Sequence, residues 1–282
     1  MNDLELKARI KTILDEEIVV FTTNGKIQTS SGKSYFLKSG FPSDIYSCEL
    51  TGLKELYKTN TINVCRGILA QHDFILTEYI EPAVQKKNFH SRFGRSLAKL
   101  HQTTGPSYGF KENNYIGVNP QLNVPSKEES TDWVAFYYNK RLLYQYKMAE
   151  KNHKVSNDMK RCFKKIETQI EKLLRPYVEP PTLIHGDLWS GNYICSQDNQ
   201  AVLIDPAVYY GQREAELALT RLFGGFDSDF YKGYEKEYPL QEGWQHREGI
   251  YRLYHIMNHL NIFGSGYLSE AEQLIRKYSE GS

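Results

Sequence analysis

The sequence predicts an α+β protein of two lobes, a small β-rich amino-terminal lobe and a larger helical carboxy-terminal lobe. Short strand-like runs crowd the first 80 residues, whereas apolar residues at helical spacing dominate after Glu81-Pro82. A chain of 282 residues is long enough for two lobes that share a cleft, and such clefts are common ligand sites. We place the lobes at residues 1–78 and 83–282, joined by a hinge at 79–82.

The small lobe is expected to begin with a helix at residues 3–15, where apolar residues form a single stripe. Strand-like runs follow, and Asn24-Gly25 and Ser31-Gly32 are turn signals between the first of them. A helical segment interrupts the strands and is expected to carry an acidic residue, Glu49, near its start. The expected strands cover residues 18–23, 34–38, 65–70 and 74–80, and this second helix covers residues 48–58.

The large lobe is expected to be mostly helical. Its first helix is indicated by Phe89, Phe93, Leu97 and Leu100, which recur at helical spacing. A short strand-loop-strand island then separates two helical regions, and this island holds the residues with the clearest chemistry. The further helices are expected at 131–150 and 156–174, the island at 182–205, and a final helical region at roughly 213–278.

Composition narrows the possible partners and the compartment. The formal net charge is +1 and the isoelectric point about 7.7, so neither nucleic acid nor an anionic membrane is expected as a partner. The amino terminus has acidic residues and no apolar core of a signal peptide, and no apolar run has the length of a membrane span. Four cysteines lie far apart without a CxxC pair, which predicts reduced thiols and a cytoplasmic protein.

The segment HGDLWSGN, residues 185–192, has the spacing of a kinase catalytic loop. His185 is followed by Asp187, and Asn192 comes five residues after the aspartate. In such loops the aspartate accepts the proton of the attacking hydroxyl group and the asparagine binds a metal ion. Taken alone, the segment fits a structural turn at the end of a strand equally well.

Three further residues follow the order that phosphoryl transfer requires. The apolar run VLIDPA delivers Asp205 to the end of a strand, where a second carboxylate could bind Mg²⁺. The strand SYFLK ends in Lys38, and Glu49 on the next helix could hold this lysine against the phosphates of ATP. We therefore predict a site for ATP and Mg²⁺.

Two other patterns are rejected. Gly32-Lys33-Ser34 is similar to the end of a Walker A loop, but that loop needs a glycine where this chain has Ile27. His255 and His259 have helical metal-ligand spacing without the glutamate of an HExxH motif, so we interpret them as buried or capping residues.

Longer blocks of the sequence resemble the fructosamine kinase (ketosamine-3-kinase) family, whose relatives include aminoglycoside and choline kinases of the protein-kinase-like fold. The resemblance covers nearly the whole chain, and Trp189 with the block NHLNIFG narrows it to fructosamine kinases. It implies an ATP-dependent phosphotransferase acting on the 3-hydroxyl of a ribulosamine, erythrulosamine or fructosamine, free or protein-bound. The phosphorylated adduct then breaks down and frees the amine, which amounts to deglycation. The blocks are HGDLWSGN, IDPAVYYGQRE, LFGGFDSDFYKGY, YHIMNHLNIFG, NNYIGVNPQLN and DWVAFYYNKRL.

The resemblance also implies a role for each matching residue. By carry-over, Asp187 is the proton acceptor, Asn192 and Asp205 are the Mg²⁺ ligands, Lys38 contacts the phosphates, and Glu49 is its partner. The hinge Glu78-Tyr79-Ile80 would hold the adenine, and Trp189 would shape the acceptor pocket.

The chain departs from the family pattern at three places. The stretch 21–31 has one glycine where the family has a Gly-Gly turn over the phosphates, which leaves open how closely this hairpin covers ATP. Gln212 replaces a histidine and Glu216 replaces an aspartate. Two alternatives stay open: a kinase for another small hydroxyl compound, such as an aminoglycoside, choline or a sugar, and a nucleotide-binding pseudokinase.

Overall fold

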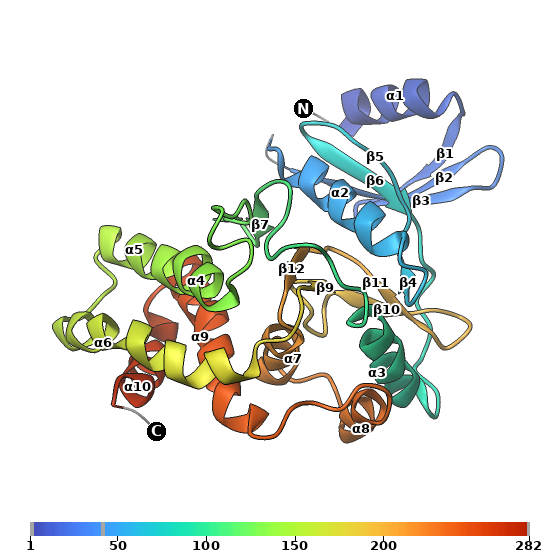
Figure 1. The fold of residues 1–282 in the computed structure, drawn as a ribbon. Coiled ribbons are helices and arrows are strands. Elements are labelled where there is room, and N and C mark those ends of the chain that lie inside the picture. The colour runs from blue at the N-terminus through green and yellow to red at the C-terminus, as the bar shows by residue number, and fades with distance from the viewer. Residues whose placement is uncertain (1–2, 41–42, 281–282) are drawn as a thin grey trace.

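The computed structural model describes residues 3–40 and 43–280, and Figure 1 shows a small lobe next to a larger helical lobe. The small lobe is built on a five-stranded antiparallel sheet in the order β1-β2-β3-β6-β5. Helix α1 lies on one face of this sheet, and α2 lies between the sheet and the large lobe. The elements are α1 (Asp3–Leu14), β1 (Ile18–Phe21), β2 (Lys26–Thr29), β3 (Ser34–Ser39), α2 (Ile45–Tyr57), β5 (Gly67–Ala70) and β6 (Phe74–Glu78). The two-lobed α+β prediction is confirmed.

Strand β3 aims its side chains alternately at α1 and at the cleft. Tyr35 and Leu37 are buried in the small-lobe core with residues of α1, whereas Phe36 and Lys38 are more exposed. Because successive side chains of a strand point to opposite faces, Lys38 reaches the α2 side of the sheet. The alternation of the sequence SYFLKS therefore places a lysine in the cleft.

Two small-lobe elements differ from their sequence-based bounds. The strand β2 was not expected, yet Ile27 and Thr29 are buried on alternate positions and pair with β1 and β3. Helix α2 begins at Ile45, three residues earlier than predicted, because Tyr46 extends its buried face. Glu49 therefore lies in the second turn of the helix, on its buried face.

The large lobe is helical around a few short strands. A π-helical segment joins α4 to α5, so the helix predicted at 131–150 is interrupted by a wider turn. The hairpin β7–β8 was not predicted. The elements are α3 (Phe89–Leu100), β7 (Asn114–Ile116), β8 (Asn119–Gln121), α4 (Trp133–Tyr137), the π-helical Tyr138–Leu143, α5 (Tyr144–Lys151), α6 (Asn157–Leu174), β9 (Thr182–Ile184), β10 (Tyr193–Cys195), β11 (Ala201–Leu203), β12 (Tyr209–Gly211), α7 (Arg213–Leu222), α8 (Ser228–Glu237), α9 (Trp244–Phe263) and α10 (Leu268–Ser279), with short 3-10 turns at Arg175–Tyr177 and Ser265–Tyr267.

The two lobes share one small sheet. Strand β4 (Asn63–Val64) follows α2 in the small lobe but runs parallel to β11 of the large lobe, in the order β10-β11-β4. The N–H of Cys65 continues this pairing by donating to the Leu203 carbonyl at 2.9 Å. The hinge that we propose at residues 79–82 is therefore accompanied by a second, hydrogen-bonded link between the lobes. Across residues 3–40 and 43–280, no helix is long and apolar enough to cross a membrane.

Candidate active site

The predicted catalytic loop connects β9 to β10 along the floor of the cleft. Gly186 has a φ of +84°, and a Cβ at this position would come within 2.1 Å of the Ala207 carbonyl oxygen, so only glycine fits. The ring of His185 donates through Nε2 to the Ile204 carbonyl at 2.8 Å, while its Nδ1 accepts from the Asp187 N–H at 3.3 Å. The HGD sequence thus folds into a tight turn that presents Asp187.

Glu216 of α7 holds this turn from below. Its carboxylate accepts the N–H groups of His185 at 3.0 Å and Gly186 at 2.7 Å, and it pairs with His101 Nε2 at 2.9 Å. Burial works against the charge, but these hydrogen bonds and the neighbouring histidines hold the pKa of Glu216 below its ordinary value. A charged carboxylate therefore fixes the backbone of the catalytic loop, although the sequence analysis assigned Glu216 no role.

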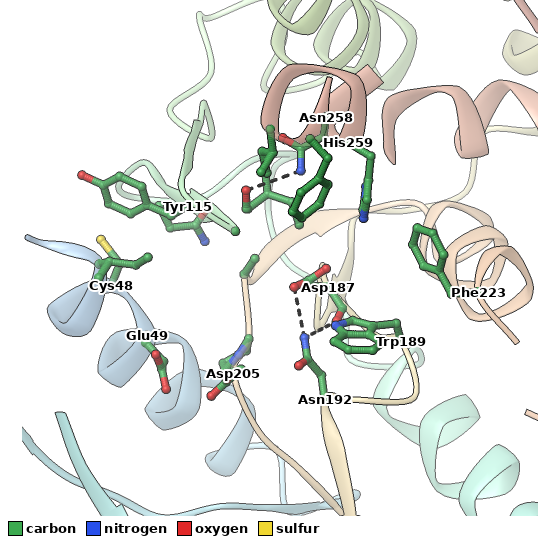
Figure 2. A pocket seen from close by; sticks show the side chains of 18 of the residues that line it. Cys48, Glu49, Tyr115, Asp187, Trp189, Asn192, Asp205, Phe223, Asn258 and His259 are labelled. Atoms are coloured by element: carbon green, nitrogen blue, oxygen red, sulfur yellow. Dashed lines mark hydrogen bonds between the residues drawn. The ribbon is translucent and has the colours of Figure 1, made fainter. Parts of the chain in front are cut away.

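Asp187 and Asn192 contact each other across the loop. Asn192 Nδ2 donates to the Asp187 carboxylate at 3.0 Å and to the Asp187 carbonyl at 2.7 Å. Burial raises the pKa of Asp187 to about 8; the charges of Asp205 and Glu216 add to this rise, and the hydrogen bond from Asn192 opposes it. Figure 2 shows the Asn192 side-chain oxygen turned away from Asp187, toward the side of Asp205.

Lys38 joins the two remaining carboxylates. Its Nζ lies 2.9 Å from Glu49 Oε2 and 2.9 Å from Asp205 Oδ2. Burial disfavours the ammonium, but the charges of Glu49 and Asp205 outweigh it and raise the pKa of Lys38. Burial and the charge of Asp205 raise the pKa of Glu49 to about 7, against the effect of Lys38. The structure thus brings residues of β3, α2 and the segment after β11 into one cluster.

Next to this cluster lies a cavity of about 220 Å³ between the sheet and the strands β10 and β11. Its walls are mainly apolar, which suits a flat heterocycle. Phe36 is 38% exposed and forms part of the wall, a contact that the sequence analysis did not predict. The other lining residues include Asn24, Leu53, Cys65, Ile75, Thr77, Pro82, Ile194, Ile204 and the predicted hinge residues Glu78, Tyr79 and Ile80.

The hinge residues differ in which of their backbone N–H and C=O groups are free of hydrogen bonds within the protein. The Tyr79 N–H donates to the Ser34 carbonyl at 3.2 Å, and the Glu78 N–H donates to the Arg66 carbonyl at 2.9 Å. Within the described residues, the N–H and C=O of Ile80 make no hydrogen bond. Ile80 therefore offers the free donor and acceptor that a purine base could use, whereas the Tyr79 N–H is occupied.

The hairpin between β1 and β2 reaches the smaller cavity with its tip. Asn24 lines the cavity, and Gly25 has a φ of +86°. A Cβ on Gly25 would lie 2.4 Å from the Leu37 carbonyl oxygen, and the Leu37 N–H donates to the Gly25 carbonyl at 2.7 Å. The single glycine of this hairpin thus fits its tip against β3, beside Lys38.

A second cavity, of about 560 Å³, lies on the other side of the same cluster. Lys38, Glu49 and Asp205 line both cavities, so the cluster is their common wall. Figure 2 shows Asp187, Trp189 and Asn192 facing Asn258 and His259 across this second cavity. Trp189 is 41% exposed, so it lines the opening and is not packed beneath the loop.

The far wall of the larger cavity holds residues that the sequence analysis did not place at a site; it interpreted His255 and His259 only as buried or capping residues. His259 of α9 donates through Nδ1 to the His255 carbonyl at 2.8 Å, which leaves Nε2 as an acceptor. Its ring lies 4.7 Å from Phe223, 5.3 Å from Phe263 and 5.1 Å from Tyr267, measured between centroids. His255 is buried, and burial together with the charges of His259 and Arg141 lowers the pKa of His255 to about 3.

Helical periodicity alone could not separate these residues from core residues. Phe223 directly follows α7, while His259 and Phe263 lie one turn apart near the end of α9, next to the buried Leu260 and Asn261. The signal that the sequence did offer was their place in two of the family blocks, LFGGFD and NHLNIFG. That signal identified the segments without saying which side chains face the cleft.

The donors present fit a magnesium ion. Mg²⁺ prefers oxygen ligands and usually keeps several waters or substrate phosphates, so one carboxylate and one amide oxygen from the protein suffice. Asp205 provides the carboxylate, and Asn192 turns its oxygen toward the same side. Within the described residues, no group of three or more His, Cys, Asp or Glu side chains could hold a metal by itself. A metal here would therefore be shared with the nucleotide.

Comparisons with known proteins find relatives over most of the chain. The family model described as fructosamine kinase matches residues 15–280. A probable ketoamine kinase of Enterococcus faecium is 34% identical over 282 residues, covering 99% of this chain and 98% of the relative. The chloroplastic protein-ribulosamine 3-kinase of Arabidopsis thaliana is 37% identical over 263 residues, covering 89% of this chain and 77% of the relative.

Solved structures also match this chain over nearly its whole length. A crystal structure from Thermobifida fusca, named as a candidate fructosamine-3-kinase, superposes with a TM-score of 0.88 at 26% identity and covers 99% of this chain and all of the other. An ADP-bound aminoglycoside phosphotransferase superposes with a TM-score of 0.63 at 12% identity, covering 99% of each chain. The second likeness concerns the fold alone, and it confirms the prediction of a protein-kinase-like fold.

Proposed function

The chain belongs to the fructosamine kinase family, and from that premise we propose that it transfers the γ-phosphoryl group of ATP to the 3-hydroxyl of a ketosamine. The observation that supports this most directly is the common wall of the two cavities. Lys38, Glu49 and Asp205 separate a small apolar cavity suited to adenine from a larger one that holds Asp187. A nucleotide on one side and an acceptor on the other would meet at these three residues.

We assign Asp187 as the proton acceptor. The acceptor oxygen forms a bond to the γ-phosphorus while the bond from this phosphorus to the β–γ bridging oxygen breaks, and ADP leaves. The hydroxyl proton passes to the Asp187 carboxylate. A pKa raised to about 8 suits a base that works near neutral pH. Such a base contributes about 10²–10⁴-fold to the rate, and positioning with charge neutralisation contributes more.

The other members of the cluster would position charge. Lys38 would contact the phosphates, and Glu49, which is buried beside it, would keep the ammonium oriented. Asn192 and Asp205 would hold Mg²⁺, which would neutralise phosphate charge when bound. Asp205 now pairs with Lys38 at 2.9 Å, so its carboxylate already lies where phosphates would be held. The backbone of Ile80 would bind the adenine base.

The lining of the acceptor cavity favours a ketosamine over an aminoglycoside. Among the described residues, its carboxylates are Glu49, Asp187 and Asp205, all of them already engaged in the phosphoryl-transfer cluster. A polycationic aminoglycoside needs additional carboxylates for its ammonium groups. The aromatic rings of Trp189, Phe223, Phe263 and Tyr267 instead offer π-faces to a single substituted amine.

The width of the opening of the larger cavity determines how large a group the substrate's amine can carry. Phe263 is 67% exposed and Trp189 is 41% exposed, so the aromatic end of the cavity is open to solvent. An amine bearing a long substituent could extend outward here while the sugar part stays near Asp187. Ribulosamine, erythrulosamine and fructosamine adducts, free or protein-bound, are therefore the substrates that we propose, and deglycation is the consequence.

A side-by-side acceptor assay tests this function. Purified protein is incubated with ATP and Mg²⁺ and with a ribulosamine, a fructosamine, an aminoglycoside or no acceptor, and ADP formation is measured. We expect acceptor-dependent ADP formation with a ketosamine, its loss in Asp187→Ala, and nucleotide binding retained by that variant. Activity only with the aminoglycoside would refute the substrate class, and nucleotide binding without turnover on any acceptor would identify a pseudokinase.

A further inference from the structure

The wall of the acceptor cavity that faces Asp187 includes the hairpin β7–β8, and the inner side of this hairpin is a cluster of buried amides. Asn114 lines the cavity and is buried, as are Gln121 and Asn123 behind it. Because water cannot reach these groups, each donor and acceptor needs a partner within the protein. We call Asn114, Gln121 and Asn123 the amide cluster.

The amide cluster is bonded to the backbone just beyond Asp205. Gln121 Nε2 donates to the Ala207 carbonyl at 2.9 Å and to Asn114 Oδ1 at 2.8 Å. Asn114 Nδ2 donates to the Val208 carbonyl at 2.9 Å. The hairpin is thus attached at two successive carbonyls, two and three residues after the proposed metal ligand.

Ala207 also contacts the catalytic loop. Its N–H donates to the His185 carbonyl at 2.9 Å, while its carbonyl accepts from Gln121. The residue therefore lies between the loop that carries Asp187 and the hairpin that forms the acceptor wall. Tyr254 of α9 completes the arrangement, because its hydroxyl donates to Gln121 Oε1 at 2.7 Å. Gln121 links three parts of the site through one side chain.

A buried cation orders the cluster from behind. Arg141, in the π-helical segment, donates through Nη2 to Asn123 Oδ1 at 2.7 Å and through Nη1 to the Leu122 carbonyl at 2.6 Å. Asn123 Nδ2 in turn donates to Asn114 Oδ1 at 2.7 Å. Among the described residues, no carboxylate pairs with Arg141. Its two Nη atoms donate to these carbonyl groups and its guanidinium lies 4.0 Å from the ring centre of Tyr209, while its Nε makes no hydrogen bond. Charge-assisted bonds are stronger than neutral ones, so they fix the amides in one orientation.

We propose that Gln121 and Asn114 are positioning residues for phosphoryl transfer. They set the separation between the acceptor wall and the segment Asp205–Ala207, and thereby align the acceptor hydroxyl with the phosphate to be transferred. Ala207 and Val208 are buried core residues, so these bonds also support the fold. What connects them to the reaction is their place in the chain, because the segment that they hold begins at the proposed metal ligand Asp205 and ends at β12. The inference rests on the proposed function, because it needs an acceptor in the larger cavity.

The substitution Gln121→Glu tests the inference without changing side-chain volume. It replaces the Nε2 donor by an oxygen that faces the Ala207 carbonyl and Asn114 Oδ1. We expect kcat/KM for the acceptor to fall roughly ten- to hundredfold, as misplacement near 1 Å does, while KM for ATP changes less than about twofold. The share of ATP hydrolysed without acceptor phosphorylation should rise, because a misaligned acceptor lets water compete.

Gln212→Glu is the matched control. Gln212 is 3% exposed and Gln121 is 1% exposed, and Gln212 Nε2 also donates to a carbonyl, that of Glu179, and to the Tyr108 hydroxyl. Neither cavity is lined by Gln212. Its change should lower the melting temperature without changing acceptor kcat/KM or the hydrolysed share. Equal kinetic effects in the two variants, or none in Gln121→Glu, would overturn the inference.

A milder pair of variants covers the case in which Gln121→Glu does not fold. Tyr254→Phe removes the donor to Gln121, and Tyr251→Phe removes a hydroxyl one turn earlier on α9, which accepts from Trp133 Nε1 at 3.1 Å. Only the first should raise the hydrolysed share of ATP. The acceptor used is whichever one the wild type phosphorylates, so the choice of acceptor tests the proposed function and the variant pairs test the positioning.

Discussion

The two cavities of the cleft are built by different means. The smaller one, of about 220 Å³, has one wall formed by β3 and β6, which are neighbours in a single sheet, and by the segment after β6. Its other side is closed by Leu53 of α2, Ile194 of β10 and Ile204. The larger one, of about 560 Å³, takes its walls from α2, β7, the catalytic loop, the end of α7 and the end of α9. Strand pairing therefore shapes one wall of the smaller cavity, whereas all walls of the larger cavity depend on the packing of elements far apart in the chain.

This difference indicates which substrate each cavity should recognise strictly and which it should recognise loosely. A sheet fixes the positions of its side chains through backbone pairing, so the smaller cavity offers a defined slot with a free donor and acceptor at Ile80. The larger cavity ends in exposed aromatic rings, whereas its inner wall, near Asp187 and the amide cluster, is held by buried hydrogen bonds. Nucleotide recognition should therefore be strict, and recognition of the amine substituent should be permissive.

A substitution in the common wall should have the largest effect on catalysis, because the residues of this wall line both cavities. Lys38→Met keeps the length of the side chain but removes the charge that Glu49 and Asp205 share. The proposed phosphate contact is lost, and kcat should fall about 10²–10³-fold, the cost of removing one preorganised charge-stabilising donor. Steady-state kinetics with ATP and a ketosamine as varied substrates should show both kcat/KM values reduced.

Lys33→Met provides the control for Lys38→Met. Lys33 precedes β3 and pairs with Glu16 at 2.7 Å, away from both cavities. This variant should keep wild-type kinetics. If Lys38→Met reduced kcat/KM for only one of the two substrates, the idea of a shared wall would be wrong.

The support beneath the catalytic loop comes next. Glu216→Gln leaves one oxygen to accept from two backbone N–H groups and removes the charge that pairs with His101. The free energy of unfolding should fall by about 3 kcal/mol, the scale of a broken buried pair. Because Asp187 follows directly after these N–H groups, kcat should fall as well. Denaturant unfolding and steady-state kinetics measure the two effects.

Acid pH should reduce this stability difference. The pKa of Glu216 is lowered by folding, so its contribution is present above the unfolded pKa near 4.3 and is lost as the pH falls through the folded value. Glu214→Gln, two residues earlier on α7, breaks the ion pair with Arg247 without touching the loop. It should reduce stability while kcat stays unchanged. A kcat loss of the same size in both variants would contradict the support role.

The sequence predicted the common wall and the catalytic loop better than the far wall of the larger cavity, for a physical reason. Strand alternation places Lys38, and a fixed spacing within one loop relates Asp187 to Asn192, so local rules are sufficient there. The orientation of His259 and Phe223 depends on how α7 and α9 pack, and the role of Glu216 depends on a contact between α7 and the catalytic loop. Periodicity identifies such residues as members of helices, but it cannot distinguish a core-facing position from a cavity-facing one.

Two phenylalanines of nearly equal exposure, one in each cavity, allow a further test of the comparison. Phe36 is 38% exposed in the smaller cavity, and Phe223 is 39% exposed in the larger cavity. Stacking on a base contributes about 1–3 kcal/mol, so Phe36→Ala should raise KM for ATP about tenfold or more and leave KM for the acceptor unchanged. Phe223→Ala should do the reverse. Changes in both constants in either variant would mean that the cavities are not independent beyond their common wall.

Cys48 should show the smallest effect, although it lines the acceptor cavity. Burial, with the charges of Glu112 and Asp44, raises the pKa of Cys48 to about 11. A thiol reacts as its thiolate, so alkylation by iodoacetamide at pH 7.5 should be roughly two orders of magnitude slower than that of free cysteine. The rate should rise as the pH approaches 11, and Cys48→Ser should change kcat/KM less than about twofold. Mass spectrometry of the labelled peptide measures the rate of alkylation. Rapid labelling that abolishes turnover but spares nucleotide binding would contradict the prediction, because it would mean that the Cys48 thiol is more accessible to solvent and more easily ionised than its surroundings indicate.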